Sequence, residues 1–271
     1  MQQEHPNNSV HPVHLASPVD PAVSEVQRLR LELERTQAAL GDFAYTMSHD
    51  LRARVRHVLA YTQLAVEDLG PALSPEVQGH LNTVAEAATQ MGLQIDGLMT
   101  WAQLDQVELR PTSLCLSQMV QEVRQSLEPE AAQRQLRWSL PSHSTQIHAD
   151  PQLVRDLLHH LLSNALKFTR TRPLAELHIG WEHEQDHAPT APLCRVSVRD
   201  NGVGFKTAMQ DKLFQVFQRL HPPHEFEGVG LGLALAKKIV ERHGGRIWAE
   251  GAPDAGCCVR FTLPLCAQAS A

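Results

Sequence analysis

The 271-residue sequence has little of what a secreted, membrane-spanning or nucleic-acid-binding protein needs. Its five cysteines are odd in number and have no C-x-x-C spacing, which is typical of a protein kept in a reducing cytoplasm. No apolar run approaches the roughly 18 residues that span a bilayer, and no charged-then-apolar signal segment opens the chain. The net charge is −6, and lysine and arginine form no long run. This charge argues against a nucleic-acid partner. From the cysteines and the lack of long apolar segments, we expect a cytoplasmic protein without a membrane span.

Histidine is abundant, with 16 residues, but these are scattered along the chain. The closest pairs are His159 with His160 and His221 with His224, and neither has a third ligand at metal-site spacing. The histidines therefore predict no zinc site.

The N-terminal half is predicted to be a helical hairpin. Residues 1–21 are rich in Pro, Asn, Ser and His and are expected to form a disordered tail. One helix is predicted over residues 22–69, ended by Gly70-Pro71. Ser74-Pro75 then has the pattern of a helix cap followed by proline at the first helical position.

The second predicted helix carries a regular apolar seam, with spacings that alternate between four and three over about three and a half heptads. The residues of this seam are Val77, Leu81, Val84, Ala88, Met91, Ile95, Leu98 and Ala102. Two antiparallel helices alone would leave much of the seam in water, so we predict a homodimeric four-helix bundle. The alternative is that the helices pack against the chain's own C-terminal half.

A change to shorter elements near Arg110-Pro111 marks the predicted domain boundary. Helices are expected at residues 117–128, 150–168, 207–218 and 231–243. Strands are expected at residues 136–140, 145–148, 175–183, 194–199, 246–250 and 257–263. Helices mixed with antiparallel strands indicate a two-layer α+β domain.

A histidine and a carboxylate, His49 and Asp50, are adjacent within the first helix. His49 lies off the apolar stripe that is predicted to be the buried face of this helix. That stripe consists of Leu40, Ala44, Met47, Leu51, Val55 and Val58. An exposed neutral imidazole can act as a nucleophile, and a neighbouring carboxylate can hold its tautomer and take a proton. Taken alone, such a pair is more often just part of a solvated helix face.

Two motifs of the C-terminal half suit a nucleotide. Asn164 and Lys167 are three residues apart on one helix face, where an amide oxygen suits Mg²⁺ and a lysine suits phosphate. Asp200 ends an apolar strand and is followed by Gly202 and Gly204. A carboxylate there can accept a hydrogen bond from an adenine amino group, although D-N-G alone also fits a simple turn.

Two further motifs follow in order. Phe214 and Phe217 have helical spacing, which usually indicates a core position. Gly228, Gly230 and Gly232 lead directly into a helix, whose N-terminus offers amide donors to phosphates. This spacing matches neither a P-loop nor a dinucleotide-binding fingerprint.

Together these motifs resemble those of the dimerising sensor histidine kinases, over roughly residues 23–265. Residues 48–53, S-H-D-L-R-A, resemble the H box of the bacterial phytochrome-type branch. The later motifs are similar to the N box, first glycine box, F box and second glycine box of the ATP-binding domain shared with gyrase and a heat-shock chaperone.

The resemblance implies a helical-hairpin dimerisation domain at residues 22–108, followed by a two-layer α/β sandwich ATP-binding domain at residues 109–266. It implies ATP and Mg²⁺ as cofactors, with Asn164 on the metal, Lys167 on phosphate and Asp200 on adenine. It further implies that Gly202 and Gly204 shape the base pocket. The three glycines of the second box would form the lid over the phosphates.

The implied activity is ATP-dependent phosphorylation of His49, with Asp50 orienting the imidazole, and transfer to an aspartate of a separate response regulator receiver domain. Input is expected from an upstream sensor partner or from the short tail. The sequence departs from the usual boxes at Arg54, His160, Val229 and Asp254. These departures leave open a catalytically weakened ATP-binding or phosphotransfer adaptor, whereas a gyrase-like ATPase would leave the H box unexplained.

Overall fold

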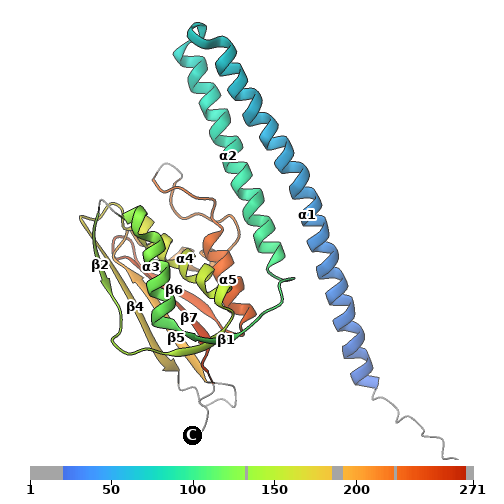
Figure 1. Ribbon diagram of the computed structural model, residues 1–271, viewed down its shortest axis with the longest axis vertical. Coiled ribbons are helices and arrows are strands. Elements are labelled where there is room, and N and C mark those ends of the chain that lie inside the picture. Colours follow the sequence, from blue (N-terminus) through green and yellow to red (C-terminus); the bar gives the residue numbers. More distant parts are fainter. Residues whose placement is uncertain (1–20, 132–133, 185–191, 223–224, 267–271) are drawn as a thin grey trace, which may run out of the picture. The chain divides into compact units, whose positions relative to one another are not determined.

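The computed structural model describes residues 21–131, 134–184, 192–222 and 225–266 (Figure 1). The predicted disordered tail lies almost entirely outside these ranges. Contacts divide the chain into two units, residues 1–40 and residues 41–271. Within the first unit, the described residues are helical from Pro21 onward. Across the described ranges, no helix is both long enough and apolar enough to cross a bilayer.

The predicted hairpin is confirmed, with bounds close to those expected. Helix α1 (Pro21–Leu69) is followed by a 3₁₀ turn, η1 (Gly70–Ala72), and by α2 (Pro75–Gln103). The hydroxyl of Ser74 accepts a hydrogen bond from the Val77 amide at 3.3 Å, as the cap pattern predicted. After residue 41, α1 runs antiparallel to α2 up to the turn that joins them (Figure 1).

The apolar faces of the hairpin are only partly covered in the single chain. On α1, Val55 is buried, but the predicted stripe is exposed at Met47, Leu51 and Val58. The α2 seam is buried at Ala88 but exposed at Val77, Val84, Met91 and Leu98. Each helix of a two-helix hairpin can bury only one narrow line of contacts, so the rest of each apolar face lies at the surface.

The C-terminal part is built on a five-stranded sheet with strand order β2-β4-β5-β7-β6. Its strands are β2 (Gln135–Ser139), β4 (Leu174–Glu184), β5 (Leu193–Asp200), β6 (Ile247–Gly251) and β7 (Cys257–Pro264). The expectation of purely antiparallel strands is wrong at one edge, where β2 pairs with β4 in parallel. The connection between these two strands contains a full helix, which is long enough for the crossover that a parallel pair requires.

A small second sheet was not predicted in full. Strand β1 (Thr112–Cys115) pairs antiparallel with β3 (Gln146–Ala149). The four residues of β1, T-S-L-C, are too few to show the alternation of a strand, so sequence reasoning missed it.

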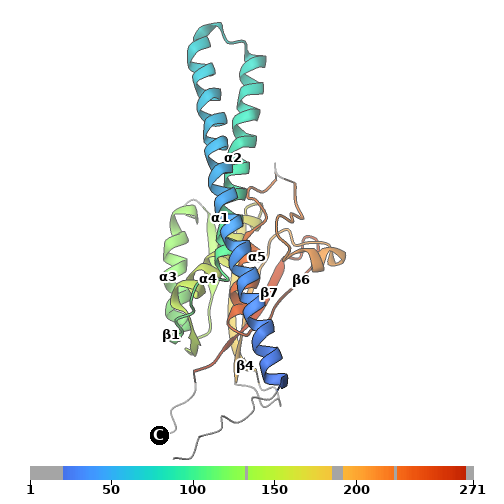
Figure 2. The same ribbon diagram turned by 90° about the vertical axis from the view of Figure 1, so that its right-hand side faces the viewer.

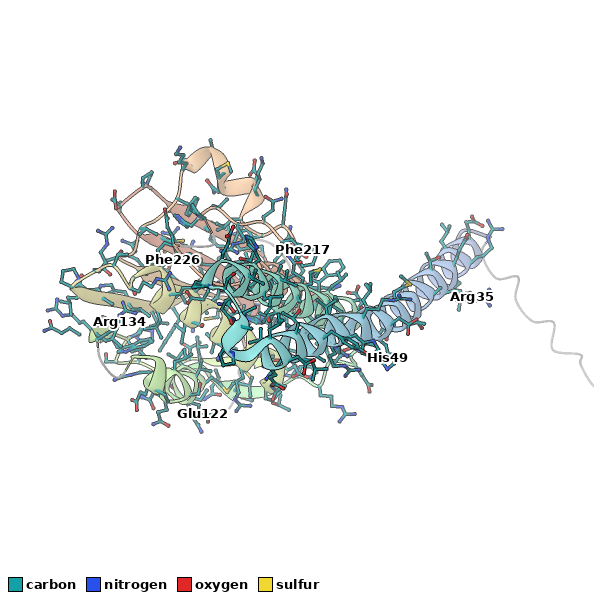
Figure 3. The ribbon with its side chains drawn as sticks, turned by 90° about the horizontal axis from the view of Figure 1, so that it is seen from above. Arg35, His49, Glu122, Arg134, Phe217 and Phe226 are labelled. Carbon is teal, nitrogen blue, oxygen red and sulfur yellow. The ribbon has the colours of Figure 1, made fainter. Side chains whose placement is uncertain are left out.

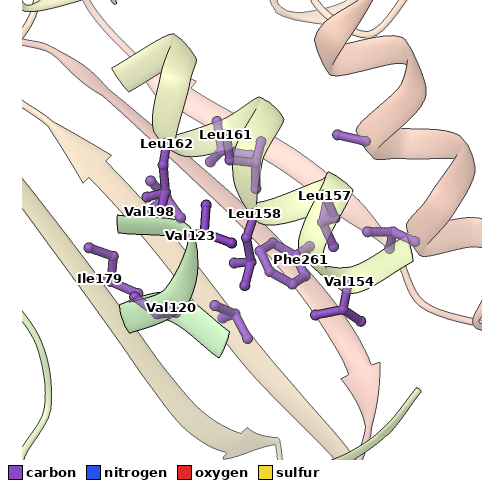
Figure 4. Packing of buried hydrophobic residues seen from close by; sticks show 14 of the residues in the cluster. Val120, Val123, Val154, Leu157, Leu158, Leu161, Leu162, Ile179, Val198 and Phe261 are labelled. Carbon is purple, nitrogen blue, oxygen red and sulfur yellow. The ribbon is translucent and has the colours of Figure 1, made fainter. Parts of the chain in front are cut away.

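Helices α3 (Leu116–Ala131), α4 (Pro151–Phe168) and α5 (Gly232–Arg242) cover one face of the large sheet (Figures 1 and 2). Apolar residues recur three and four apart on α4 and pack onto strands β4, β5 and β7 (Figure 4). The residues at the centre of this core are Leu157, Leu158, Leu161, Leu162, Ile179, Val198 and Phe261. The predicted two-layer arrangement is therefore confirmed.

The helix predicted at residues 207–218 is wrong. Only a short 3₁₀ segment, η2 (Thr207–Lys212), forms there, and turns follow it. Phe217 has a φ of 62°, a left-handed conformation that a continuing α-helix cannot contain. The carbonyl oxygen of Gln218 lies only 2.6 Å from the position that a Cβ at Gly230 would occupy. Close packing against the glycine-rich segment thus replaces the helix that the spacing suggested.

A buried histidine joins α5 to the start of α4. His243 Nδ1 donates to the carbonyl oxygen of Ile239 at 2.8 Å, and Nε2 accepts from the backbone amide of Asp150 at 3.0 Å. The Asp150 carboxylate caps α4 by accepting from the amides of Gln152 and Leu153. It also accepts from the amide of Arg110 at 3.0 Å. This network holds the first residues of the C-terminal half against both helices.

Replacing His243 by phenylalanine should lower the free energy of unfolding by about 1–3 kcal/mol, because the buried Asp150 amide would lose its acceptor. Urea unfolding monitored by circular dichroism measures the change. The control is His148→Phe at an exposed position on β3. Equal stabilities of the two variants would show that the His243 network does not hold the fold.

Candidate functional site

The predicted nucleophile is fully accessible on α1. The side chains of His49 and Asp50 are each 67% exposed, and Figure 3 shows His49 on the surface of the helix. His49 Nδ1 lies 3.5 Å from the Asp50 carboxylate oxygen Oδ1. Three residues later, Arg52 Nε donates to Asp96 of α2 at 2.8 Å, which fixes the two helices together one turn away. The imidazole of His49 is therefore accessible to solvent beside a carboxylate.

A second set of predicted residues surrounds one cavity of about 260 Å³ in the C-terminal half. It is bounded by α4, the end of β5, the segment that leads into α5, and the start of β7. The predicted residues that line it are Asn164, Lys167, Asp200, Gly204, Gly228, Gly230 and Gly232. The remaining one, Gly202, donates its amide to Asp200 Oδ1 at 2.8 Å. The structure therefore brings together all the predicted nucleotide-binding residues.

Asp200 is a buried carboxylate at the end of β5. Oδ1 accepts from the amides of Gly202 and Cys257, at 2.8 and 3.3 Å. Oδ2 has no hydrogen-bond partner among the residues that the structure describes. Burial raises the pKa of Asp200 to about 6, with the two amide hydrogen bonds acting in the opposite direction. At neutral pH the carboxylate is ionised, and Oδ2 can accept a hydrogen bond from a donor in the cavity.

The loop that follows Asp200 is held rigidly rather than forming a simple surface turn. Arg172 donates to the carbonyl oxygens of Asn201 and Gly202, both at 2.9 Å, and to that of Asp254 at 3.1 Å. Gly204 has a φ of 63°, and a Cβ there would lie 1.9 Å from a neighbouring carbonyl oxygen. Only glycine fits this position, because the chain's own backbone passes so close.

The glycine-rich segment forms another part of the cavity wall. Gly228 and Gly230 have φ values of 121° and 77°, and Gly232 begins α5. Lys167 Nζ lies 3.4 Å from the position of a Cβ at Gly228, and burial lowers the pKa of Lys167. An ammonium group and a helix N-terminus therefore border the same part of the cavity, an arrangement suited to phosphate.

A histidine accompanies Asn164 on α4. A Cβ at Gly232 would lie 3.6 Å from both Asn164 Nδ2 and His160 Nδ1. Burial lowers the pKa of His160, so the ring is neutral at pH 7.

Sequence reasoning missed an aromatic group beside the cavity. The ring centroid of Phe168 lies 5.1 Å from that of Phe226 and 5.5 Å from that of His221. The guanidinium carbon of Arg170 lies 4.7 Å from the Phe226 ring centroid. These residues come from a helix end and a turn segment, so no periodic pattern could have found them. Phe217, predicted as a core position, is instead 39% exposed.

The comparisons with known proteins agree with this geometry. Residues 149–267 match the family described as histidine kinase-, DNA gyrase B- and HSP90-like ATPases. The chain is 30% identical over 243 residues to the methanogenesis regulatory histidine kinase FilI of Methanothrix harundinacea, covering 90% of this chain and 26% of that protein. It is 32% identical over 250 residues to cyanobacterial phytochrome A of Nostoc sp., covering 89% of this chain and 30% of that protein.

The chain thus spans between a quarter and a third of these curated relatives. Among solved structures, that of histidine kinase ThkA in complex with response regulator protein TrrA has a TM-score of 0.58. It is 19% identical, with 87% of this chain and 66% of that chain covered, and supports the fold. The cavity is that of an ATP-binding domain shared by kinases, gyrases and chaperones. With the helical hairpin before this domain, the chain belongs to the sensor histidine kinase family. Members of the phytochrome-type branch of that family are among its relatives.

Proposed function

We propose that this chain is an ATP-dependent protein histidine kinase that phosphorylates His49 and passes the phosphoryl group to an aspartate of a response regulator receiver domain. The observation that carries this proposal is a cavity whose lining combines a buried carboxylate, Asp200, with a lysine and a glycine-rich segment. The same chain carries an exposed imidazole next to a carboxylate. The alignments with the sensor kinase relatives cover 90% and 89% of this chain.

The cavity suits the two ends of ATP. Asp200 accepts a hydrogen bond from the adenine amino group, and Gly202 and Gly204 allow the base to approach the backbone. Lys167 and the amides at the start of α5 bind phosphate oxygens, with Gly228, Gly230 and Gly232 forming the lid. The amide oxygen of Asn164 fits a hard cation that also keeps phosphate oxygens and waters, so it would hold Mg²⁺. Bound there, Mg²⁺ supplies charge neutralisation for the triphosphate.

His49 is the phosphoacceptor in this proposal. Its Nδ1–H donates toward Asp50, so Nε2 carries the lone pair that attacks the γ-phosphorus. The bond between that phosphorus and the β–γ bridging oxygen breaks, and ADP leaves with the electron pair. Asp50 accepts the Nδ1 proton, so the phosphorylated ring ends neutral.

Incubation of the chain with γ-labelled ATP and Mg²⁺ tests the activity, and we expect the label to appear on the protein. The weakened adaptor, favoured by Val229, His160 and Arg54, would bind nucleotide and remain unlabelled. That result would overturn the kinase proposal.

We further propose that residues 22–108 form a homodimeric four-helix bundle and that residues 109–266 form the catalytic domain. Support comes from the apolar residues left uncovered on both helices of the hairpin. A second copy packed along these faces would remove them from water. An upstream sensor partner would act through the same helices.

Met91 lies on the exposed α2 seam, where it is 46% exposed in the single chain. The full chain should sediment as a dimer, and Met91→Lys should weaken dimerisation by at least about tenfold because it would bury an unpaired charge. Gln90→Lys, at the exposed neighbouring position, is the control and should leave the dimer intact. A native chain that sediments as a monomer at micromolar concentration would contradict the bundle.

A further inference from the structure

His160 lies one helical turn before Asn164, so both side chains project from the same face of α4. The two converge on one point at the start of α5. A Cβ at Gly232 would stand 3.6 Å from His160 Nδ1 and 3.6 Å from Asn164 Nδ2. The absence of a side chain at Gly232 leaves this point open to both polar atoms. A half-turn of the Asn164 amide exchanges its nitrogen and oxygen there without moving any other atom.

The fold makes no use of the His160 ring nitrogens. In the described part of the chain, the only ring contact of His160 is an edge contact with His159, whose centroid lies 6.3 Å away. Neither ring nitrogen of His160 has a hydrogen-bond partner among the described residues. By contrast, the buried His243 uses both of its nitrogens in structural hydrogen bonds. An imidazole that has no structural partner, on a face shared with Asn164, is available to a ligand.

Asn164 is the residue that would hold the cation of the ATP complex, so this inference rests on the proposed function. We infer that His160 is a second ligand to that cation and that the site therefore prefers a divalent first-row transition ion to Mg²⁺. Mg²⁺ favours oxygen ligands, whereas imidazole nitrogen binds Co²⁺, Zn²⁺ and similar ions more strongly. Replacing one oxygen ligand by an imidazole shifts the preference in that direction.

The test uses the full chain with the non-hydrolysable nucleotide AMP-PNP. Pulsed electron paramagnetic resonance of its Mn²⁺ complex detects nitrogen nuclei that are bound to the metal. Native protein should give an imidazole nitrogen signal that changes when the histidines are labelled with ¹⁵N, which separates them from adenine and amide nitrogens. His160→Asn should remove this signal, while His159→Asn, one position away and exposed, should keep it.

Calorimetry provides a second measurement. Native protein should bind the Co²⁺ complex of AMP-PNP at least about tenfold more tightly than the Mg²⁺ complex, and the ratio should fall toward one in His160→Asn. Binding of the Mg²⁺ complex by His160→Asn shows that this variant folds. The inference is overturned if native protein binds the nucleotide without a histidine signal and has the same ratio of Co²⁺-complex to Mg²⁺-complex affinity as His160→Asn. That result leaves the kinase proposal intact. If no metal complex of AMP-PNP binds to native protein, both are overturned.

Discussion

Replacing His49 by glutamine should abolish phosphorylation of the protein by ATP while leaving nucleotide affinity unchanged. Glutamine keeps the length and polarity of the side chain but has no nucleophilic ring nitrogen. His49 is 67% exposed on α1, so its replacement removes no core contact. This variant should therefore bind AMP-PNP as tightly as native protein does and incorporate no label.

The matched control is His57→Gln, eight residues along the same helix and also exposed. His57 has no carboxylate beside it in the sequence, and its replacement should leave labelling at the native level. The labelling of Asp50→Asn should lie between that of the His49 and His57 variants, because His49 Nε2 remains while the proton acceptor is lost. Full labelling of the His49 variant would place the phosphoacceptor elsewhere.

Asp200→Asn should weaken ATP binding by about ten- to a hundredfold, the cost of losing a charge-assisted hydrogen bond to adenine. The variant should be no less stable than native protein. Burial raises the pKa of Asp200 to about 6, so keeping this carboxylate ionised at pH 7 costs folding free energy that asparagine does not. Calorimetric binding and urea unfolding measure the two effects, and unchanged affinity would count against the adenine assignment.

The same carboxylate predicts a pH dependence. Ionised Asp200 accepts the adenine hydrogen bond, and protonation below its pKa of about 6 competes with binding. Native affinity should therefore fall as the pH drops below 6, by up to the ten- to hundredfold that is expected for Asp200→Asn. Adenosine is the better probe, because it lacks the phosphates that also titrate in this range. Asp200→Asn has no proton to gain there, so its weaker affinity should stay level over the same range.

Several elements could be predicted within one or two residues because their ends have explicit signals. The caps at Ser74 and Asp150 and the stop at Gly70 are local chemistry, and the structure places helix ends at each of them. The prediction of a helix at residues 207–218 was wrong because this segment has no such local signals. Its conformation depends on close contact with Gly230, which is distant in sequence.

The residues of the site also fall into those that local sequence predicts and those that depend on contacts between distant segments. Asp200 and the glycines were predictable because each motif is contiguous and has a local conformational requirement. The aromatic group of Phe168, His221 and Phe226 forms only when the end of α4 meets the turn segment that carries the other two rings. His160 is one of the positions at which the sequence departs from the usual boxes. Its position beside Asn164 and Gly232 gives that departure a chemical meaning.

The chemical identity of the phosphorylated residue is the most direct test of the account. Native protein should be incubated with γ-labelled ATP and Mg²⁺, and the label tested in acid and in alkali before the phosphopeptide is mapped. Phosphohistidine is lost in acid and survives alkali, so we expect an acid-labile, alkali-stable label on the peptide that contains His49. An acid-stable label, or no label on protein that binds ATP, would contradict it.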